Sequence, residues 1–143
     1  PAGAKKRRLR KVGIRMEAAA LLDAHVQLKR IYTALSEALD VTRQLADAVD
    51  RDDRIAVQML VSMRQEPTDK LSGAHQALEQ QRQSLPAADA ARLAAILKGG
   101  EAETEEEDHL ACQVGANQRF LKQLVDLDRV VNRKLAREKS IYK

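Results

Sequence analysis

The chain has 143 residues, which suits one hydrophobic core and leaves little room for a second domain. Its aromatic content is only 2%, and alanine, leucine, glutamine, arginine and glutamate are abundant, so the composition argues against a β-sheet protein and favours helices. The formal net charge of +4 is unevenly placed, because seven of the 25 basic residues lie in residues 1–15, and the remainder holds 18 basic against 21 acidic residues.

Residues 1–15 form a basic segment without any acid. Blocks of like charge are commonly disordered, so we expect a disordered leader followed by a single helical domain over residues 16–143. A basic segment can also bind nucleic acid or an anionic membrane surface through contacts that do not depend on sequence. Nucleic-acid binding through this segment therefore stays open as an alternative.

The first predicted helix extends from Met16 to about Val49. Apolar residues return at helical spacing, with Lys, Arg, Glu and Gln between them. The aspartate-rich stretch "DAVDRDDR" predicts a turn and the start of the next helix, where the positive end of the helix dipole favours acids. The expected apolar stripe consists of Leu21, Leu28, Tyr32, Leu35, Leu39, Thr42, Leu45 and Val49.

A second helix is predicted with Leu60, Met63, Leu71, Ala74 and Leu78 on its apolar face. A proline at position 67 removes one backbone hydrogen bond and clashes with the preceding turn. We therefore expect a kink near residue 64, although a restart of the helix at the proline is the alternative.

A short, alanine-rich third helix is predicted from Pro86 up to a stop at Gly99 and Gly100. The acidic run that follows resembles a cation site. However, Thr104 and Glu107 have the spacing of a capping box, and acids in the first turn of a helix are stabilised by its dipole. We therefore interpret this run as the start of the fourth helix.

The fourth predicted helix, from Glu105 to Tyr142, is unusually long for a domain of this size. Its stripe returns in alternating steps of three and four, the pattern of a coiled coil or an elongated bundle. The sequence thus predicts an all-α fold: an elongated antiparallel bundle of three long helices and one short helix with coiled-coil-like packing. The stripe consists of Leu110, Val114, Asn117, Leu121, Leu124, Val131, Leu135 and Tyr142, with Asp128 as a second polar interruption besides Asn117.

No catalytic or metal-binding motif is found. The histidines His25, His75 and His109 are widely separated, and Glu106 with His109 gives only one of the two Glu-x-x-His pairs that a di-iron bundle needs. A single cysteine, Cys112, excludes an intramolecular disulfide framework and is typical of a reducing compartment. We expect a cytoplasmic protein without enzyme activity, cofactor, bound metal or membrane insertion.

The order of the elements resembles the FlgN-type flagellar export chaperones. The resemblance rests on a long helix ("LKRIYTALSEALDVTRQLADAV"), an aspartate-rich break, a second helix ending "LEQQRQSL", a short helix, and a final helix with "ANQRFLKQLVDLDRVVNRKL". Asn117, Asn132 and Tyr142 match the asparagine-rich segment and the terminal tyrosine of that family. The proline at position 67 and the end of the chain soon after this tyrosine depart from the family pattern.

The resemblance implies a chaperone for the bacterial flagellum that holds hook-associated, filament-junction proteins for export by binding their terminal helices. Its last helix would bind the client through Asn117, Leu121, Leu124, Val131, Leu135 and Tyr142. We place the client at the C-terminal end of this stripe, around Val131 and Leu135, because the other helices are expected to be shorter. An acidic client could pair with Arg129, Arg133 and Arg137, and a self-associating coiled-coil scaffold, hence a homo-oligomer, is the other alternative.

Overall fold

The computed structural model describes residues 16–141, so the predictions for residues 1–15 and for Tyr142 lie outside the described part of the chain. Between residues 16 and 141 the fold is all helical and holds no strand, which confirms the all-α class. The helices are α2 (Ala18–Asp50), α3 (Arg54–Met63), α4 (Gln65–Ser84), α5 (Ala87–Leu97) and α6 (Glu105–Ile141).

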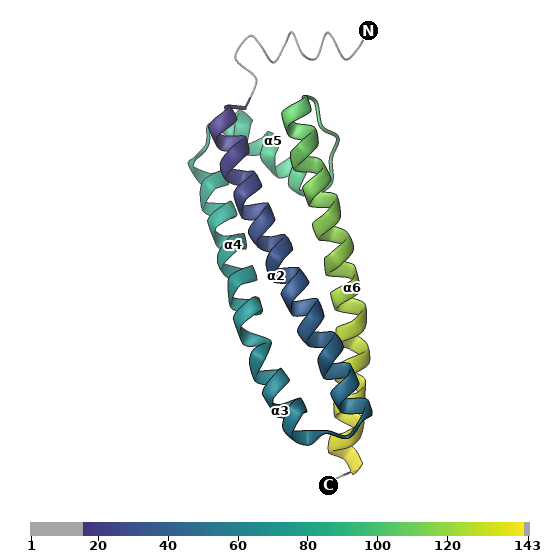
Figure 1. The fold of residues 1–143 in the computed structure, drawn as a ribbon. Coiled ribbons are helices and arrows are strands. Elements are labelled where there is room, and N and C mark those ends of the chain that lie inside the picture. The colour runs from purple at the N-terminus through teal and green to yellow at the C-terminus, as the bar shows by residue number, and fades with distance from the viewer. Residues whose placement is uncertain (1–15, 142–143) are drawn as a thin grey trace.

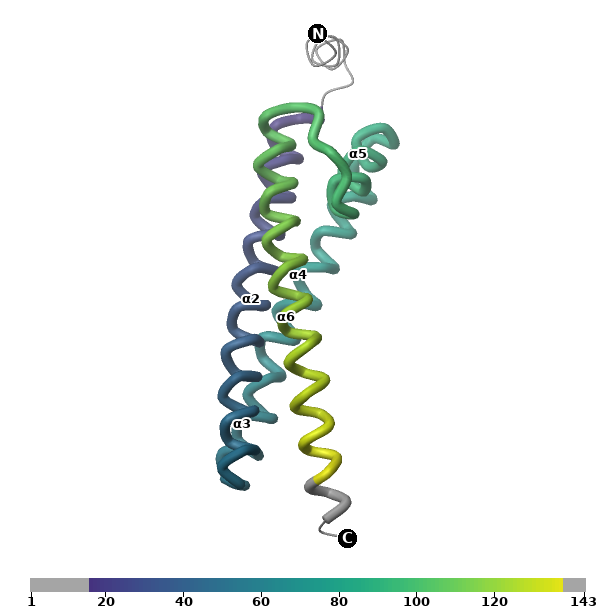
Figure 2. Tube along the Cα trace, turned by 90° about the vertical axis from the view of Figure 1, so that its right-hand side faces the viewer, coloured from purple at the N-terminus to yellow at the C-terminus, as the bar shows by residue number. Residues whose placement is uncertain are grey.

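The helices form an elongated, rod-like arrangement (Figure 1). Helix α2 runs the length of the rod, α3 and α4 return beside it, α5 crosses the far end, and α6 runs back along α2 (Figures 1 and 2). Helix α2 packs against α3, α4 and α6, whereas α4 and α6 have little direct contact with each other. Helix α2 is therefore the central element, and α4 and α6 flank it.

The apolar stripe predicted for the first helix is buried along α2, with one exception. Tyr32 remains 39% exposed, but its ring lies 4.8 Å, between centroids, from that of Phe120 in α6. The stripe is buried because α3, α4 and α6 all pack on α2. Burial of such a stripe, more than helix propensity, accounts for the stability of a long helix in water.

The predicted second helix is divided into α3 and α4 at Arg64, where the sequence placed the interruption. Asp53 caps α3 by accepting a 3.1 Å hydrogen bond from the backbone N–H of Ala56. Pro67 lies in the first turn of α4, where the missing N–H needs no partner within the helix, and its ring is buried. The prediction that Met63 is a core residue is wrong, because its side chain is 47% exposed.

Helix α5 (Ala87–Leu97) is terminated by Gly99, which has a φ of 95°, a conformation in which a β-carbon is strained. The N–H of Gly99 bonds to Ile96 O and the N–H of Gly100 bonds to Ala95 O, both at 2.9 Å. This pattern closes the helix as a Schellman motif. A β-carbon on Gly100 would lie only 2.7 Å from Ala95 O, so both glycines of the predicted stop are needed.

The core consists of two clusters that follow one another along the rod. The upper one joins the first half of α2 to α4, α5 and the start of α6, with Leu93 and Ile96 of α5 fully buried. The lower one joins the second half of α2 to α3 and α6 around Leu45, Leu60 and Val131. Side chains of α2, α3 and α6 thus share one buried core at the lower end of the rod. No helix in the described range 16–141 combines the length and apolar character needed to cross a membrane.

Candidate functional site

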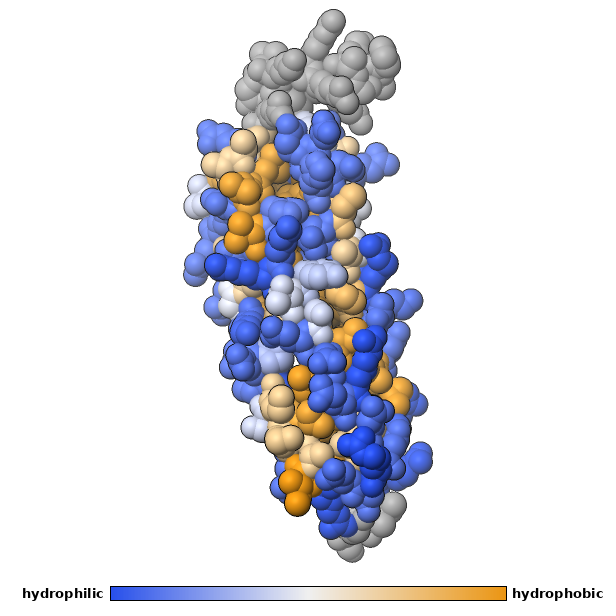
Figure 3. All heavy atoms as spheres, in the orientation of Figure 1, coloured by the Kyte–Doolittle hydropathy of each residue, from blue (hydrophilic) through white to orange (hydrophobic). Residues whose placement is uncertain are grey.

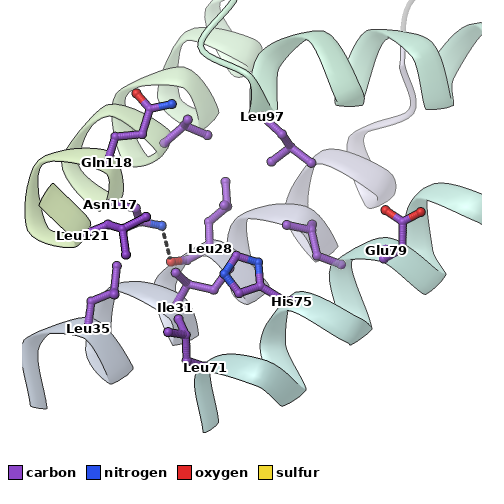
Figure 4. Close-up of a pocket in the computed structure, with 12 residues that line it drawn as sticks. Leu28, Ile31, Leu35, Leu71, His75, Glu79, Leu97, Asn117, Gln118 and Leu121 are labelled. Carbon is purple, nitrogen blue, oxygen red and sulfur yellow. Dashed lines mark hydrogen bonds between the residues drawn. The ribbon is translucent and has the colours of Figure 1, made fainter. Parts of the chain in front are cut away.

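An open groove of about 400 Å³ lies between α4 and α6, with α2 as its floor. We call it the α4–α6 groove. Leu28, Ile31 and Leu35 of α2 line the floor, and Leu97 of α5 bounds one end (Figure 4). The lining is mainly aliphatic, which is the character of a surface that binds apolar side chains.

The groove is open because the apolar face of α4 is too narrow to pack against both α2 and α6. Ala74 and Leu78 are buried, and Leu71 is half-buried, but His75 and Glu79 in the same wall are polar and exposed. Helix α5 also contacts both α4 and α6 at the upper end (Figure 2). Its buried side chains act there as a spacer, so α4 and α6 do not close on each other.

Asn117 lies in the α6 wall, but its amide is occupied within the protein. Its Nδ2 donates a 2.9 Å hydrogen bond to the carbonyl oxygen of Leu28 (Figure 4). Its Oδ1 accepts one of 3.1 Å from Gln113. The side chain is buried. A buried amide bonded to a neighbouring helix fixes how two helices are aligned, so Asn117 joins α6 to α2 beneath the groove.

Leu121 is the residue of the predicted binding stripe that the structure places best for a partner. It lines the groove beside Asn117 and Gln118, and 46% of its surface is exposed (Figure 4). Leu124, one turn further on, is half-buried and packs against the upper core cluster. Within one helical turn, the apolar stripe of α6 therefore passes from the surface of the groove to the core.

The expected client position around Val131 is wrong. Val131 is fully buried in the lower core cluster, and Leu135 packs against the same cluster. The expectation assumed that α6 extends beyond its neighbours at this end. Helix α3 and the end of α2 reach as far as these residues and cover them, so a partner cannot contact Val131 without opening the core.

Arg129, Arg133 and Arg137, the predicted electrostatic contacts, are all exposed on α6. Arg133 Nε donates a 3.4 Å hydrogen bond to the backbone oxygen of Arg129. Their neighbour Lys134 instead pairs with Asp50 of α2 at 2.6 Å. The three arginines are thus available at the surface, whereas the lysine joins α6 to the end of α2.

His25, Glu106 and His109 line one shallow depression at the upper end of the rod. Burial, reinforced by the nearby charges of Lys29 and His109, lowers the pKa of His25 below its ordinary value of 6.5. No group of three or more potential ligands within residues 16–141 is arranged to hold a metal ion. The depression therefore does not define a metal centre in the described part of the chain.

The ion pairs between different helices were not predicted from the sequence, and two of them lie at helix ends. Glu107 is 1% exposed and accepts a 2.8 Å hydrogen bond from Arg92 Nε in α5. It also takes part in the cap of α6, because its backbone N–H donates a 3.1 Å hydrogen bond to Thr104 Oγ1. Arg64, at the interruption between α3 and α4, pairs with Asp128 at 2.8 Å. Arg92 is the one basic residue of the alanine-rich helix α5. This isolated charge is the feature of the sequence from which its pairing with Glu107 could have been predicted.

No protein-family model, curated protein or solved structure matches this chain.

Proposed function

We propose that the protein binds an amphipathic helix of a partner protein in the α4–α6 groove and acts as a helix-sequestering chaperone. The observation that carries the proposal is the groove itself, an aliphatic trough between two helices that flank a third. An amphipathic helix laid in such a trough buries its apolar face against the receiving helices. The bound helix would complete a four-helix arrangement, a stable solution for helices with one apolar stripe each.

The groove has suitable dimensions for this role. Its α6 wall extends from Val114 to Leu121, which corresponds to about 10 Å of helix at 1.5 Å per residue, or about two turns. Two turns present three or four apolar side chains to the floor. This is the spacing of anchors in helix-in-groove recognition.

The class of partner is proposed from the resemblance of the sequence to FlgN-type chaperones. On that basis, the terminal helices of hook-associated flagellar proteins are the first partners to test, and the proposed compartment is the cytoplasm. Coiled-coil-like packing of α2 against α6 is part of the same proposal, and alternating steps of three and four in both stripes support it. The role is binding without catalysis.

The experiment compares two substitutions on α6. Leu121→Glu places a charge in the groove, whereas Val130→Glu, the matched control, places one at a 38% exposed position on another face of the same helix. Each variant is first checked by thermal unfolding. Binding of a fluorescent peptide from the C-terminal helix of a hook-associated protein is then measured by anisotropy.

Leu121→Glu should weaken binding at least tenfold and Val130→Glu should leave it unchanged, because a charge buried without a partner is costly. Equal affinities for the two variants, or no binding by the unmodified protein, would count against the proposal.

Self-association is a second candidate, favoured by a different surface. Ile55, Met59 and Met63 recur every four residues on α3 and are 82%, 57% and 47% exposed. Figure 3 shows apolar side chains at several places on one face of the rod, including its lower end, where α3 lies. An exposed apolar row of this kind is suited to pairing with a second copy of the chain. Sedimentation equilibrium of the Ile55→Glu, Met59→Glu double variant tests this, because a dimer formed through α3 should dissociate.

Nucleic-acid binding depends on residues 1–15, which lie outside the described part of the chain, and it stays a prediction.

A further inference from the structure

Helix α3 carries an apolar row that is left exposed by the rest of the described chain. Ile55, Met59 and Met63 form this row, which we call the α3 row, and they are 82%, 57% and 47% exposed. At 1.5 Å per residue the row extends over about 12 Å, close to the length of the α6 wall of the α4–α6 groove. The row therefore has the length and the number of apolar side chains that such a groove accepts.

The α3 row and the groove are also compatible in charge. Helix α3 holds no charged residue between Ile55 and Met63. Among the described residues that line the groove, the titratable side chains are His75 and Glu79 of α4, and both are exposed. Glu79 also accepts a 3.0 Å hydrogen bond from Arg82 Nε in the same helix. An apolar row on the groove floor can leave both side chains in water, so the contact need not bury an unpaired charge.

The other exposed apolar side chains between residues 16 and 141 do not form a comparable row. Leu22 and Val26 of α2 are 64% and 41% exposed, but the next turn of that face brings the exposed Lys29. Val125 and Val130 of α6 lie on different faces, because five residues turn a helix by about 140°. The α3 row is thus the described surface that suits the groove best.

The α3 row of one chain lies at the wrong end of the rod to enter the groove of the same chain. Helix α3 packs in the lower core cluster through Leu60. The groove lies beside the upper cluster and is bounded by Leu97 of α5, and α5 and α3 are at opposite ends of the rod (Figures 1 and 4). A second copy of the chain must therefore supply the row.

We propose that, without a client, the α3 row of one copy docks in the α4–α6 groove of a second copy, so that self-association and client binding compete for the groove. The inference rests on the proposed function, because it uses the same groove, and it adds the regulation of that site. The contact joins two different surfaces, unlike a dimer in which α3 pairs with α3. A contact of two helical turns is small, so the association is weak and a client helix can displace it. Met59 and Met63 suit such a contact, since methionine side chains are flexible and adapt to irregular apolar surfaces.

The test separates the two surfaces by substitution. Leu121→Glu alters the groove, and the double variant Ile55→Glu, Met59→Glu alters the α3 row. Val130→Glu, on another face of α6, is the control. Each variant is checked by thermal unfolding, and sedimentation is then measured from about 10 µM to about 1 mM, the range in which a weak contact forms.

The unmodified protein and Val130→Glu should associate as the concentration rises, whereas Leu121→Glu and the double variant should each remain monomeric. An equimolar mixture of these two variants should form a dimer, because one supplies an intact row and the other an intact groove. Association of Leu121→Glu alone would show that α3 pairs with α3 and would overturn the inference. A mixture that stays monomeric while the unmodified protein associates would also overturn it.

A cross-link locates the contact. In a Cys112→Ser background, protein with Ser62→Cys, at an exposed position beside the α3 row, is mixed with protein that carries Gln118→Cys in the groove wall. A disulfide between the two proteins is expected. Gln80→Cys, at an exposed position of α4 outside the groove lining, replaces Gln118→Cys in the control and should give much less product. Equal yields with the two partners would overturn the inference.

The peptide from the C-terminal helix of a hook-associated protein distinguishes this inference from the proposed function. If both hold, the peptide should lower the sedimentation coefficient of the associated protein and the yield of the disulfide. A protein that stays monomeric up to about 1 mM and still binds the peptide would overturn the inference and leave the proposed function intact. Association through the groove without binding of the peptide would support the inference and overturn the proposed client.

Discussion

The guanidinium of Arg64 lies 2.8 Å from the carboxylate of Asp128, and this pair joins the two places where the apolar patterns of the chain are interrupted. One is the junction between α3 and α4, three residues before Pro67. The other is the polar position in the stripe of α6. The junction between α3 and α4 places a cation opposite an acid of α6, so both interruptions take part in the same contact. This contact lies beyond the lower end of the α4–α6 groove.

Asp128→Asn should lower the free energy of unfolding by about 0.5–1 kcal/mol, because each side chain of the pair is about one-third exposed and water screens the interaction. The loss should shrink in about 1 M salt. Urea denaturation at two salt concentrations measures both effects. Asp126→Asn, at an exposed position on the same helix, is the control and should change little. A loss for Asp128→Asn that does not depend on salt would mean that the pair acts through packing.

The order of the helices and several of their ends could be predicted from the sequence because these features follow from local signals. The stripe of α2, the glycine stop after α5 and the threonine cap of α6 each depend on residues within a few positions of one another. The interruption at Arg64 is equally local, since the proline three residues later produces it.

The site could be predicted only in part. The periodicity of apolar residues shows that a helix has a face to be buried, but it does not show which element covers that face. Leu121 and Val131 belong to the same stripe of α6, yet one lines an open groove and the other is enclosed by α2 and α3. That difference depends on where α3 ends and on the spacing that α5 imposes between α4 and α6. Pairing of Arg92 with Glu107 likewise depends on how the loop after α5 folds back.

Val131→Ala should lower the free energy of unfolding by about 1–3 kcal/mol, because it removes two fully buried methyl groups and leaves a cavity. Val130→Ala, at the neighbouring exposed position, should change it by less than about 0.5 kcal/mol. Chemical denaturation of the two variants gives the comparison. Similar small effects for both would show that the lower core cluster is not packed around Val131.

Glu107→Gln should lower the free energy of unfolding by about 1–3 kcal/mol. The change removes one charge of a pair that is largely shielded from water, and it leaves Arg92 without its anionic partner at that atom. Glu105→Gln, in the same helical turn but exposed, is the control. The double variant Arg92→Met, Glu107→Leu should recover much of the loss, because it removes both charges together. If the double variant is no more stable than Glu107→Gln, the acid acts mainly as a cap.

His25 should make the protein less stable as the pH falls below about 6.5. Partial burial and the charges of Lys29 and His109 lower its pKa in the folded state, so the unfolded chain takes up the proton first. The stabilisation from this group is therefore complete above the ordinary pKa of 6.5 and is lost progressively as the pH falls towards the lower folded value. His25→Gln should flatten the dependence of the melting temperature on pH between 7 and about 5. An unchanged slope in His25→Gln would assign the acid sensitivity to other groups.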